Sequence, residues 1–377
     1  MQRANPSRAA GRDETLPFRA DHVGSLLRPQ ELKDAARDFH GKKIDEEKFR
    51  EIQDRCIREA VTMQEDVGLQ SITDGEFRRG SWFLGFIEAI DGLTTAPSLF
   101  GFYDDDGGHA SFQTAYVSGK LKRRRGIATD EFRFVRSITQ ATPKVTMPTP
   151  SLVHFFRGNE AVDRSAYPDL NQFWSDLIAI YRKELKDLAA VGCRYVQLDE
   201  VPCAMLCDPK IREEVRKQGV DPERLVDIYI DAINAAVAGK PAGMTIALHL
   251  CRGNYKGRWM AEGGYEAVAE KLFNKAAVDA FFLEYDSARA GGFEPLRLVP
   301  NDKRVVLGLI STKTPALEPL DNLKRRVEEA SRFLSLDRLC VSPQCGFASS
   351  VGGNPLTIDD ERKKLRRVVE LAESIWS

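Results

Sequence analysis

Short apolar runs alternate with longer segments of helical period along most of the chain. The runs end in glycine or polar residues, as the buried strands of a parallel sheet do. Parallel strands need long crossover connections, so the segments between the runs are expected to be helices that cover the sheet. Eight runs can be recognised, at residues 18–24, 70–74, 143–147, 194–198, 244–248, 278–283, 304–310 and 339–343.

The segments between the runs carry the signals that begin and end helices. Asp221, Pro222 and Glu223 supply an N-cap, a first-turn proline and a first-turn acid to a helix predicted over residues 225–238. Apolar residues within 173–188 recur with a period of about 3.6, which predicts an amphipathic helix against the sheet. Eight strands with intervening helices favour a closed (β/α)8 barrel over an open sheet.

The length of 377 residues accommodates such a barrel with insertions. The segment at about 82–142, after the second run, is too long for a simple crossover, so we expect a β-rich or irregular insertion there. Residues 1–15 are rich in Arg and Ala and are expected to form a flexible leader. Residues 16–377 are then expected to form a single barrel domain.

The net charge limits the class of ligand, and the cysteine content indicates the cellular compartment. A formal net charge of -1, from nearly equal acidic and basic counts, gives no global field toward nucleic acid or an anionic membrane. A small-molecule ligand is therefore expected. Seven cysteines without the spacing of a disulfide framework indicate a reducing compartment, for which we expect the cytoplasm. The first fifteen residues lack the apolar segment of a signal peptide or a membrane span.

Polar or thiol side chains follow all but one of the predicted strands. The strand ends of a (β/α)8 barrel converge on one cavity, and an uncompensated buried polar group costs several kcal/mol. A shared polar site at this end of the barrel explains the pattern better than core packing does. The residues concerned are Ser25, Asp74, Glu76, Asp199, Glu200, His249, Cys251, Glu284, Asp286, Ser311, Lys313 and Cys345.

One subset of these residues has the chemistry of metal ligands. His249 and Cys251 are two positions apart at a strand end, so both side chains point to the same side. Glu284 and Cys345 follow the sixth and eighth strands and are placed to approach the same point. An imidazole, two thiolates and a carboxylate suit a tetrahedral Zn²⁺ ion. The alternative is that Cys251 is a buried thiol and His249 a hydrogen-bonded barrel histidine.

Six motifs occur in order from residue 18 to the C-terminus. They are Ala20-Asp21-His22-Val23-Gly24-Ser25, Ile72-Thr73-Asp74-Gly75-Glu76-Phe77, Val196-Gln197-Leu198-Asp199-Glu200, His249-Leu250-Cys251, Phe282-Leu283-Glu284 and Ser342-Pro343-Gln344-Cys345-Gly346. Their order and spacing resemble the catalytic barrel of the cobalamin-independent methionine synthase family. The resemblance implies the (β/α)8 barrel type that this family shares with uroporphyrinogen decarboxylase.

The resemblance also implies the reaction and the roles of the strand-end residues. It implies a methyltransferase that moves a methyl group from a donor such as methyltetrahydrofolate to the small thiol homocysteine, as in methionine synthesis, with Zn²⁺ as cofactor. The positions that match the family's zinc ligands are His249, Cys251, Glu284 and Cys345. The positions that match its homocysteine-binding residues are Ser25, Glu76 and Asp199.

The chain departs from the family pattern near the methyl donor. It has length for only the catalytic barrel, whereas full-length members carry two. Ser311 and Lys313 stand where the family has an acid and a histidine that relay a proton, and Phe156 replaces a tryptophan that contacts folate. These changes weaken the expectation of methyltetrahydrofolate as the donor. Lys313 becomes the candidate catalytic residue, as a general acid or as a charge that neutralises an anionic substrate.

Two other functions are compatible with this reading. The loop sequences also resemble short single-barrel relatives, including the zinc-dependent epoxyalkane:coenzyme M transferases and methionine synthase II-like proteins. In a transferase of that kind, Arg252, Arg289 or Lys313 would pair with a sulfonate, although each is equally typical of a rim charge. The other alternative is a metal-free lyase related to uroporphyrinogen decarboxylase.

Overall fold

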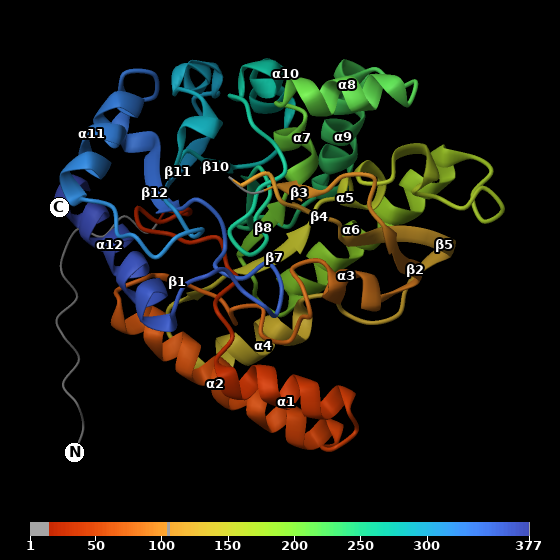
Figure 1. The fold of residues 1–377 in the computed structure, drawn as a ribbon, viewed down its shortest axis with the longest axis horizontal. Helices are drawn as coiled ribbons and strands as arrows, with labels where there is room; N and C mark the ends of the chain where they lie inside the picture. The colour runs from red at the N-terminus through yellow and green to blue at the C-terminus, as the bar shows by residue number, and fades with distance from the viewer. Residues whose placement is uncertain (1–14, 104–105, 377) are drawn as a thin grey trace.

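Six parallel strands make up the continuous central sheet in a computed structural model that describes residues 15–103 and 106–376. Their order in the sheet is their order in the chain, so each strand pairs with the next one after a crossover on the outside (Figure 1). The strands are β7 (Val145–Pro148), β8 (Tyr195–Asp199), β9 (Thr245–Leu250), β10 (Ala280–Glu284), β11 (Arg304–Ile310) and β12 (Leu339–Pro343).

Two shorter strands and the first apolar run complete the ring. The shorter strands are β1 (Ser71–Ile72) and β6 (Thr142–Pro143), which pair in parallel. The amide of Asp21 donates to the carbonyl of Val341 in β12 at 3.0 Å, and the amide of Leu26 donates to the carbonyl of Gly75, beyond β1, at 3.1 Å. The first run therefore lies between β12 and β1, and the predicted (β/α)8 barrel is confirmed.

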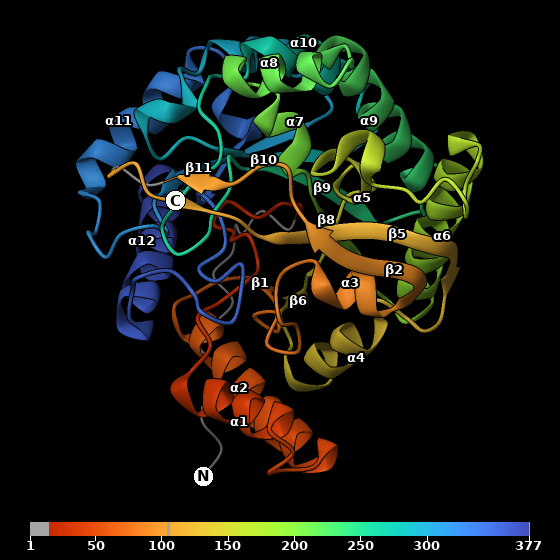
Figure 2. The same cartoon turned by 45° about the vertical axis from the view of Figure 1, so that its right-hand side comes forward.

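Helices cover the outside of the barrel (Figure 2). The longer ones are α1 (Gln30–His40), α2 (Glu46–Asp66), α4 (Thr129–Ile138), α6 (Leu170–Ala190), α8 (Pro209–Lys217), α9 (Pro222–Val237), α10 (Glu266–Lys275), α11 (Leu320–Ser331) and α12 (Ile358–Trp376). The side chain of Asp221 accepts the amide of Glu223 at 3.0 Å, which caps α9 as the sequence predicts. None of the described helices combines the length and apolar character needed to cross a bilayer.

The segment between β1 and β6 contains a long antiparallel hairpin. Its strands are β2 (Ile90–Pro97), β3 (Phe102–Tyr103), β4 (His109–Ala110) and β5 (Gln113–Arg123), where β2 pairs with β5 and β3 with β4. Three short helices also lie near the strand ends: α3 (Leu84–Glu88), α5 (Leu152–Phe155) and α7 (Val201–Met205). The helix α4, although within 82–142, packs beside α2 and α6 as a barrel helix does. The expected leader falls almost entirely on residues 1–14, outside the described residues.

Residues from the first four segments of the ring form a buried polar cluster in the barrel interior. The carboxylate of Asp21 accepts hydrogen bonds from Ser71 Oγ and Tyr195 Oη, each at 2.7 Å, and pairs with Lys144 Nζ at 2.9 Å. All four side chains are buried. The amide Nε2 of Gln197 then donates to Asp199 Oδ1 at 2.8 Å, at the end of β8. Hydrogen-bonded polar groups thus extend from the barrel interior to the strand ends.

The carboxyl of Glu361 in α12 gives a testable pH dependence. Burial raises its pKa from 4.5 to about 8, although the amide of Leu27 donates to it at 2.8 Å. The folded chain therefore keeps a proton that the unfolded chain loses, so this group lowers the free energy of unfolding as the pH rises from about 4.5 to 8. Glu361→Gln keeps an acceptor for Leu27 and stays neutral at every pH.

We expect Glu361→Gln and the parent protein to have nearly the same free energy of unfolding below about pH 4.5. Above pH 8 the variant should be more stable by on the order of 4 kcal/mol, measured by urea unfolding. The matched control is Glu370→Gln on the exposed face of the same helix, which should change the free energy of unfolding by less than about 1 kcal/mol. A constant difference between the Glu361 variant and the parent across this range would contradict the assignment.

Candidate active site and metal centre

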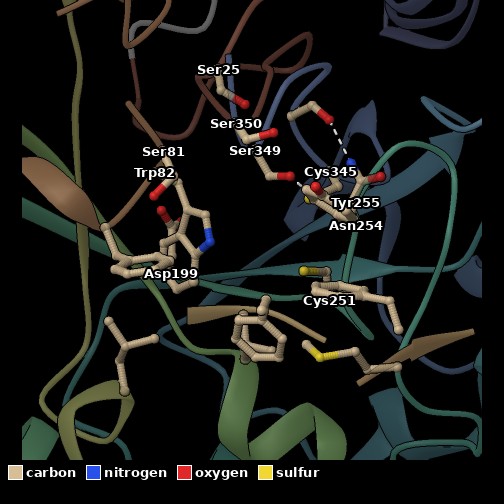
Figure 3. Close-up of a pocket in the computed structure, with 18 of the residues that line it drawn as sticks. Ser25, Ser81, Trp82, Asp199, Cys251, Asn254, Tyr255, Cys345, Ser349 and Ser350 are labelled. Atoms are coloured by element: carbon tan, nitrogen blue, oxygen red, sulfur yellow. Dashed lines mark hydrogen bonds between the residues drawn. The ribbon is translucent and has the colours of Figure 1, made fainter. Parts of the chain in front are cut away.

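A cavity of about 480 Å³ opens where the strands end. Its volume is within the range of small-molecule sites, roughly 300–1,000 Å³. Six of the predicted site residues line it: Ser25, Glu76, Asp199, His249, Cys251 and Cys345. Figure 3 shows Cys251 and Cys345 on one side of the cavity and Asp199 and Trp82 on the other. The fold therefore brings these residues together, as the strand-end pattern predicts.

Three of these residues form a compact group of potential metal ligands. The ligand atoms of His249, Cys251 and Cys345 all lie within 4.8 Å of one another, and all three residues are buried. Neither ring nitrogen of His249 has a hydrogen-bond partner in the described part of the chain. The adjacent Cys251 thiol, together with His249 and Lys313, holds the pKa of Cys345 well below its usual value. Unpaired ring nitrogens beside an ionisable thiol fit the donor set of a metal ion.

Glu284 lies at the end of β10, next to the strand that carries His249. It is fully buried, and its Oε2 accepts the amide of Arg252 at 2.7 Å. Its Oε1 has no hydrogen-bond partner among the described residues, which leaves one carboxylate oxygen available as a ligand. Glu284 is not one of the residues in the compact group, and it does not line the cavity. Burial raises the pKa of its carboxyl, and the charge of Lys313 opposes that rise.

The carboxylates of Glu76 and Asp199 reach the cavity from different strand ends. Glu76 Oε1 accepts the Thr146 hydroxyl at 2.7 Å, while its buried Oε2 has no partner in the described chain. The backbone of Glu76 has φ of 61°, a conformation that is uncommon outside glycine and typical of functional loops. Burial raises the pKa of Asp199 to about 7, with the charge of Glu76 contributing.

Ser25 is held close to the loop that carries Cys345. A side chain at Gly346 would place its Cβ 1.9 Å from Ser25 Oγ, so any residue other than glycine would force the Ser25 hydroxyl to move. The amide of Phe347 donates to the Ser25 carbonyl at 2.9 Å. The close approach positions the Ser25 hydroxyl beside the loop of the metal-ligand group.

Lys313 lies behind this group and does not line the cavity. Its buried ammonium makes no hydrogen bond to the described residues. Glu284 is the largest of the nearby charges that raise the pKa of Lys313, followed by Asp286, Cys345 and Cys251, and these outweigh the opposing effect of burial. Lys313 therefore acts electrostatically on the candidate ligands from outside the cavity.

Local sequence patterns do not indicate the aromatic side of the cavity. The side chains that form it are Trp82, Phe83, Phe102, Phe112, Phe156 and Tyr255. Phe156 alone is indicated by the sequence, from its match to a folate-contacting tryptophan. Phe102 and Phe112 belong to the hairpin segment between β1 and β6, and no local pattern shows that this segment reaches the strand ends. Tyr255 lies four positions after Cys251, and this closeness to a predicted site residue is the one signal that the sequence offers for it.

Fold and cavity together define a barrel enzyme with a candidate metal centre at the carboxyl ends of its strands. The family model described as cobalamin-independent synthase, catalytic domain, matches residues 18–374. The chain belongs to this family, whose members are methyltransferases. The resemblance seen in the motifs is confirmed, and so is the prediction of a methyltransferase.

Relatives and solved structures match over most of their length. The uncharacterized protein YxjH of Bacillus subtilis is 42% identical over 364 residues, which are 96% of this chain and 95% of YxjH. A methionine synthase of Pyrococcus abyssi is 27% identical over 336 residues, 88% of this chain and 84% of that protein. The structure of a putative vitamin-B12 independent methionine synthase from Listeria monocytogenes has a TM-score of 0.76 at 34% identity, covering 97% of this chain and 100% of that one.

The salt bridge that compensates Glu76 gives a second prediction. Arg79 is buried, lies 3.6 Å from Glu76 Oε1 and also pairs with Glu131 in α4. Arg79→Met leaves both acids without this partner, so we expect a loss of about 3–5 kcal/mol in the free energy of unfolding, measured in urea. The control is Arg133→Met in α4, which should cost less than about 1 kcal/mol, because its ion pair with Asp130 is exposed. Equal losses in both variants would refute the assignment.

Proposed function

We propose that this protein transfers a methyl group to the thiol of homocysteine at a zinc ion. His249, Cys251 and Cys345 would hold the ion, with Glu284 as the fourth ligand. The observation that carries the proposal is the convergence of one imidazole with two unpaired nitrogens and two buried thiols in one cavity. Family membership supports homocysteine as the acceptor, since cobalamin-independent methionine synthases act on it. Zinc takes N, S and O ligands of these kinds.

When bound, zinc would keep the substrate thiol ionised near neutral pH, where a free thiol with a pKa of about 8.5 is mostly protonated. The two cysteines and Glu284 bring enough negative charge to offset the ion, so electron density remains on the substrate sulfur. Cys251 and Cys345 are buried, so a substrate sulfur beside them would be partly shielded from water. The sulfur would then form a bond to the methyl carbon of the donor, giving the thioether of methionine, while the bond from that carbon to the donor atom breaks and the donor leaves with the bonding pair.

Ser25, Glu76 and Asp199 would hold the amino-acid part of homocysteine. Glu76 and Asp199 are the carboxylates of the cavity, and one oxygen of Glu76 is free to accept a hydrogen bond from an ammonium group. Ser25 offers a hydroxyl to the substrate carboxylate from another loop. Gln197 keeps the Asp199 carboxylate in place through the 2.8 Å hydrogen bond to Oδ1.

The lining of the cavity favours methyl transfer over the sulfonate alternative. Arg252, Arg289 and Lys313, the groups expected to pair with a sulfonate, do not line the cavity. Arg252 is buried and donates to the carbonyl of Gly263 at 2.8 Å. A metal-free lyase, for its part, would have no use for two buried thiols beside an unpaired imidazole.

Metal analysis tests the ligand assignment. We expect about one zinc per chain in the purified protein, and loss of that zinc in His249→Ala and Cys345→Ser, because each removes a ligand. Glu284→Gln keeps an acceptor for the Arg252 amide and should weaken zinc binding by about 10- to 100-fold. Cys193→Ser is the control, since Cys193 is buried away from the cavity and should retain zinc. Full zinc content in the His249 and Cys345 variants would defeat the proposal.

We also propose that Lys313 acts as a positioning charge behind Glu284. Its ammonium stabilises anionic sulfur in the cavity, so Lys313→Met should raise the pKa of the bound homocysteine thiol. The acidic limb of the profile of kcat against pH, which reports groups in the enzyme–substrate complex, should move upward by about one unit, with zinc retained. Lys303→Met is the control, because Lys303 precedes β11 at the opposite end of the strands and bonds the Phe273 carbonyl at 3.1 Å. An unshifted profile for Lys313→Met would exclude this role.

A further inference from the structure

The aromatic side of the cavity has no role in the proposed function so far. Several of its rings are in mutual contact. The ring centroids of Phe102 and Phe112 lie 5.1 Å apart, those of Phe102 and Tyr255 5.3 Å, and those of Phe112 and Phe156 5.2 Å. Trp82, from the loop after β1, lies across the cavity from Tyr255 (Figure 3). We call Phe102, Phe112, Phe156 and Tyr255 the aromatic wall.

The aromatic wall is held by contacts between two distant segments. The amide of Tyr103 in the hairpin segment donates to the Trp259 carbonyl at 2.7 Å, and the Trp259 amide donates back at 3.0 Å. The guanidinium of Arg289 stacks 4.2 Å from the centre of the Trp259 ring. This clamp fixes Phe102 and Phe112 against the loop that follows Cys251. These contacts hold the hairpin side of the aromatic wall in a defined position.

The protein groups of the cavity carry a net negative charge, and a bound Zn²⁺ would be more than offset by two thiolates and the Glu284 carboxylate. Aromatic faces carry partial negative charge and attract cations. Glu76 and Asp199 add two carboxylates, and Cys251 and Cys345 add thiolates when a metal is bound. Every described side chain that lines the cavity is neutral or acidic apart from the imidazole of His249. Both the aromatic wall and the net negative charge of the cavity therefore favour a cationic second substrate.

We propose that the methyl donor is a small methylated onium compound, a sulfonium or a quaternary ammonium, whose positive centre lies against the aromatic wall. The inference rests on the proposed transfer to homocysteine and names the second substrate of the same cavity. The thiolate sulfur forms a bond to the methyl carbon while the bond from that carbon to the onium sulfur or nitrogen breaks. The bonding pair returns to the leaving atom, which departs as a neutral thioether or tertiary amine.

This reaction suits the groups that are present. A neutral thioether or amine takes no proton as it leaves, so Lys313 can remain outside the cavity. In this reaction an anionic thiolate and a cationic onium group become neutral at the reacting atoms. A cavity with apolar walls destabilises the two separate charges more than the transition state, in which the charges are partly neutralised, so the barrier falls. An amine donor of neutral charge would instead need a proton at its leaving nitrogen.

Parallel donor assays test the inference with the zinc-loaded, full-length protein and homocysteine. The donors are S-methylmethionine as a sulfonium, trimethylglycine as a quaternary ammonium and methyltetrahydrofolate as an anionic pterin. Homocysteine carries deuterium on its carbon chain, and methionine that retains this label is measured by mass spectrometry, because S-methylmethionine itself leaves as unlabelled methionine. Turnover with either onium compound, at least about 10-fold above that with methyltetrahydrofolate, supports the inference, and the two onium arms identify which centre is used.

Homocysteine binding, measured by calorimetry on the same preparation, separates the two proposals. If homocysteine binds but only methyltetrahydrofolate, or no donor, gives methionine, the onium inference is overturned and the acceptor assignment stands. If homocysteine does not bind to zinc-loaded protein, the proposed function itself fails.

Variants of the aromatic wall test where the cation binds. Phe112→Leu and Tyr255→Leu remove ring faces from two different segments, and each should raise KM for the onium donor by about 3- to 30-fold. The KM for homocysteine should stay within about twofold, which a general loss of structure would not allow. Phe333→Leu, distant from the cavity, should change neither constant. Equal changes in both KM values for the wall variants would overturn the placement.

Discussion

Compensation of buried charge is the constraint on which this barrel depends. The interior holds Asp21 and Lys144 as an ion pair that water does not reach, and such a pair is tolerated only when its remaining hydrogen bonds are satisfied. Ser71 in β1 and Tyr195 in β8 satisfy those of Asp21. The cluster therefore fixes the first four segments of the ring relative to one another. The carboxyl ends of these segments, which carry site residues, are aligned as a result.

In the candidate site some buried polar groups are compensated by partners, and others are not. Arg79 compensates Glu76 and Glu131 through ion pairs, whereas His249, Glu284 and Lys313 keep polar atoms without partners in the described chain. Unpaired buried groups are costly, and folded proteins retain them mainly where a ligand completes them. Buried atoms without a partner occur elsewhere in the described chain as well, but those of His249 and Glu284 belong to candidate ligands. They thus support the position of the proposed zinc ion.

Local patterns in the sequence predict the strands, the α9 cap and the ring of polar strand ends, because each depends on periodicity or on adjacent residues. Other features depend on contacts between distant residues and leave no local signal. The pairing of Tyr103 with Trp259 brings the hairpin segment to the cavity, and α4 is a barrel helix within the expected insertion. The sequence likewise does not show that Glu284 stands apart from the compact ligand group, or that Lys313 lies outside the cavity.

The hairpin segment between β1 and β6 contributes to one side of the cavity only. Its rings Phe102 and Phe112 are attached to the barrel by the Tyr103 clamp, while the thiols sit on the barrel itself. Under the proposed function, part of the donor-facing wall therefore lies in a segment of the chain separate from the thiols. Replacement of this hairpin segment during evolution would change the donor side of the cavity while the thiol-activating centre on the barrel stays the same.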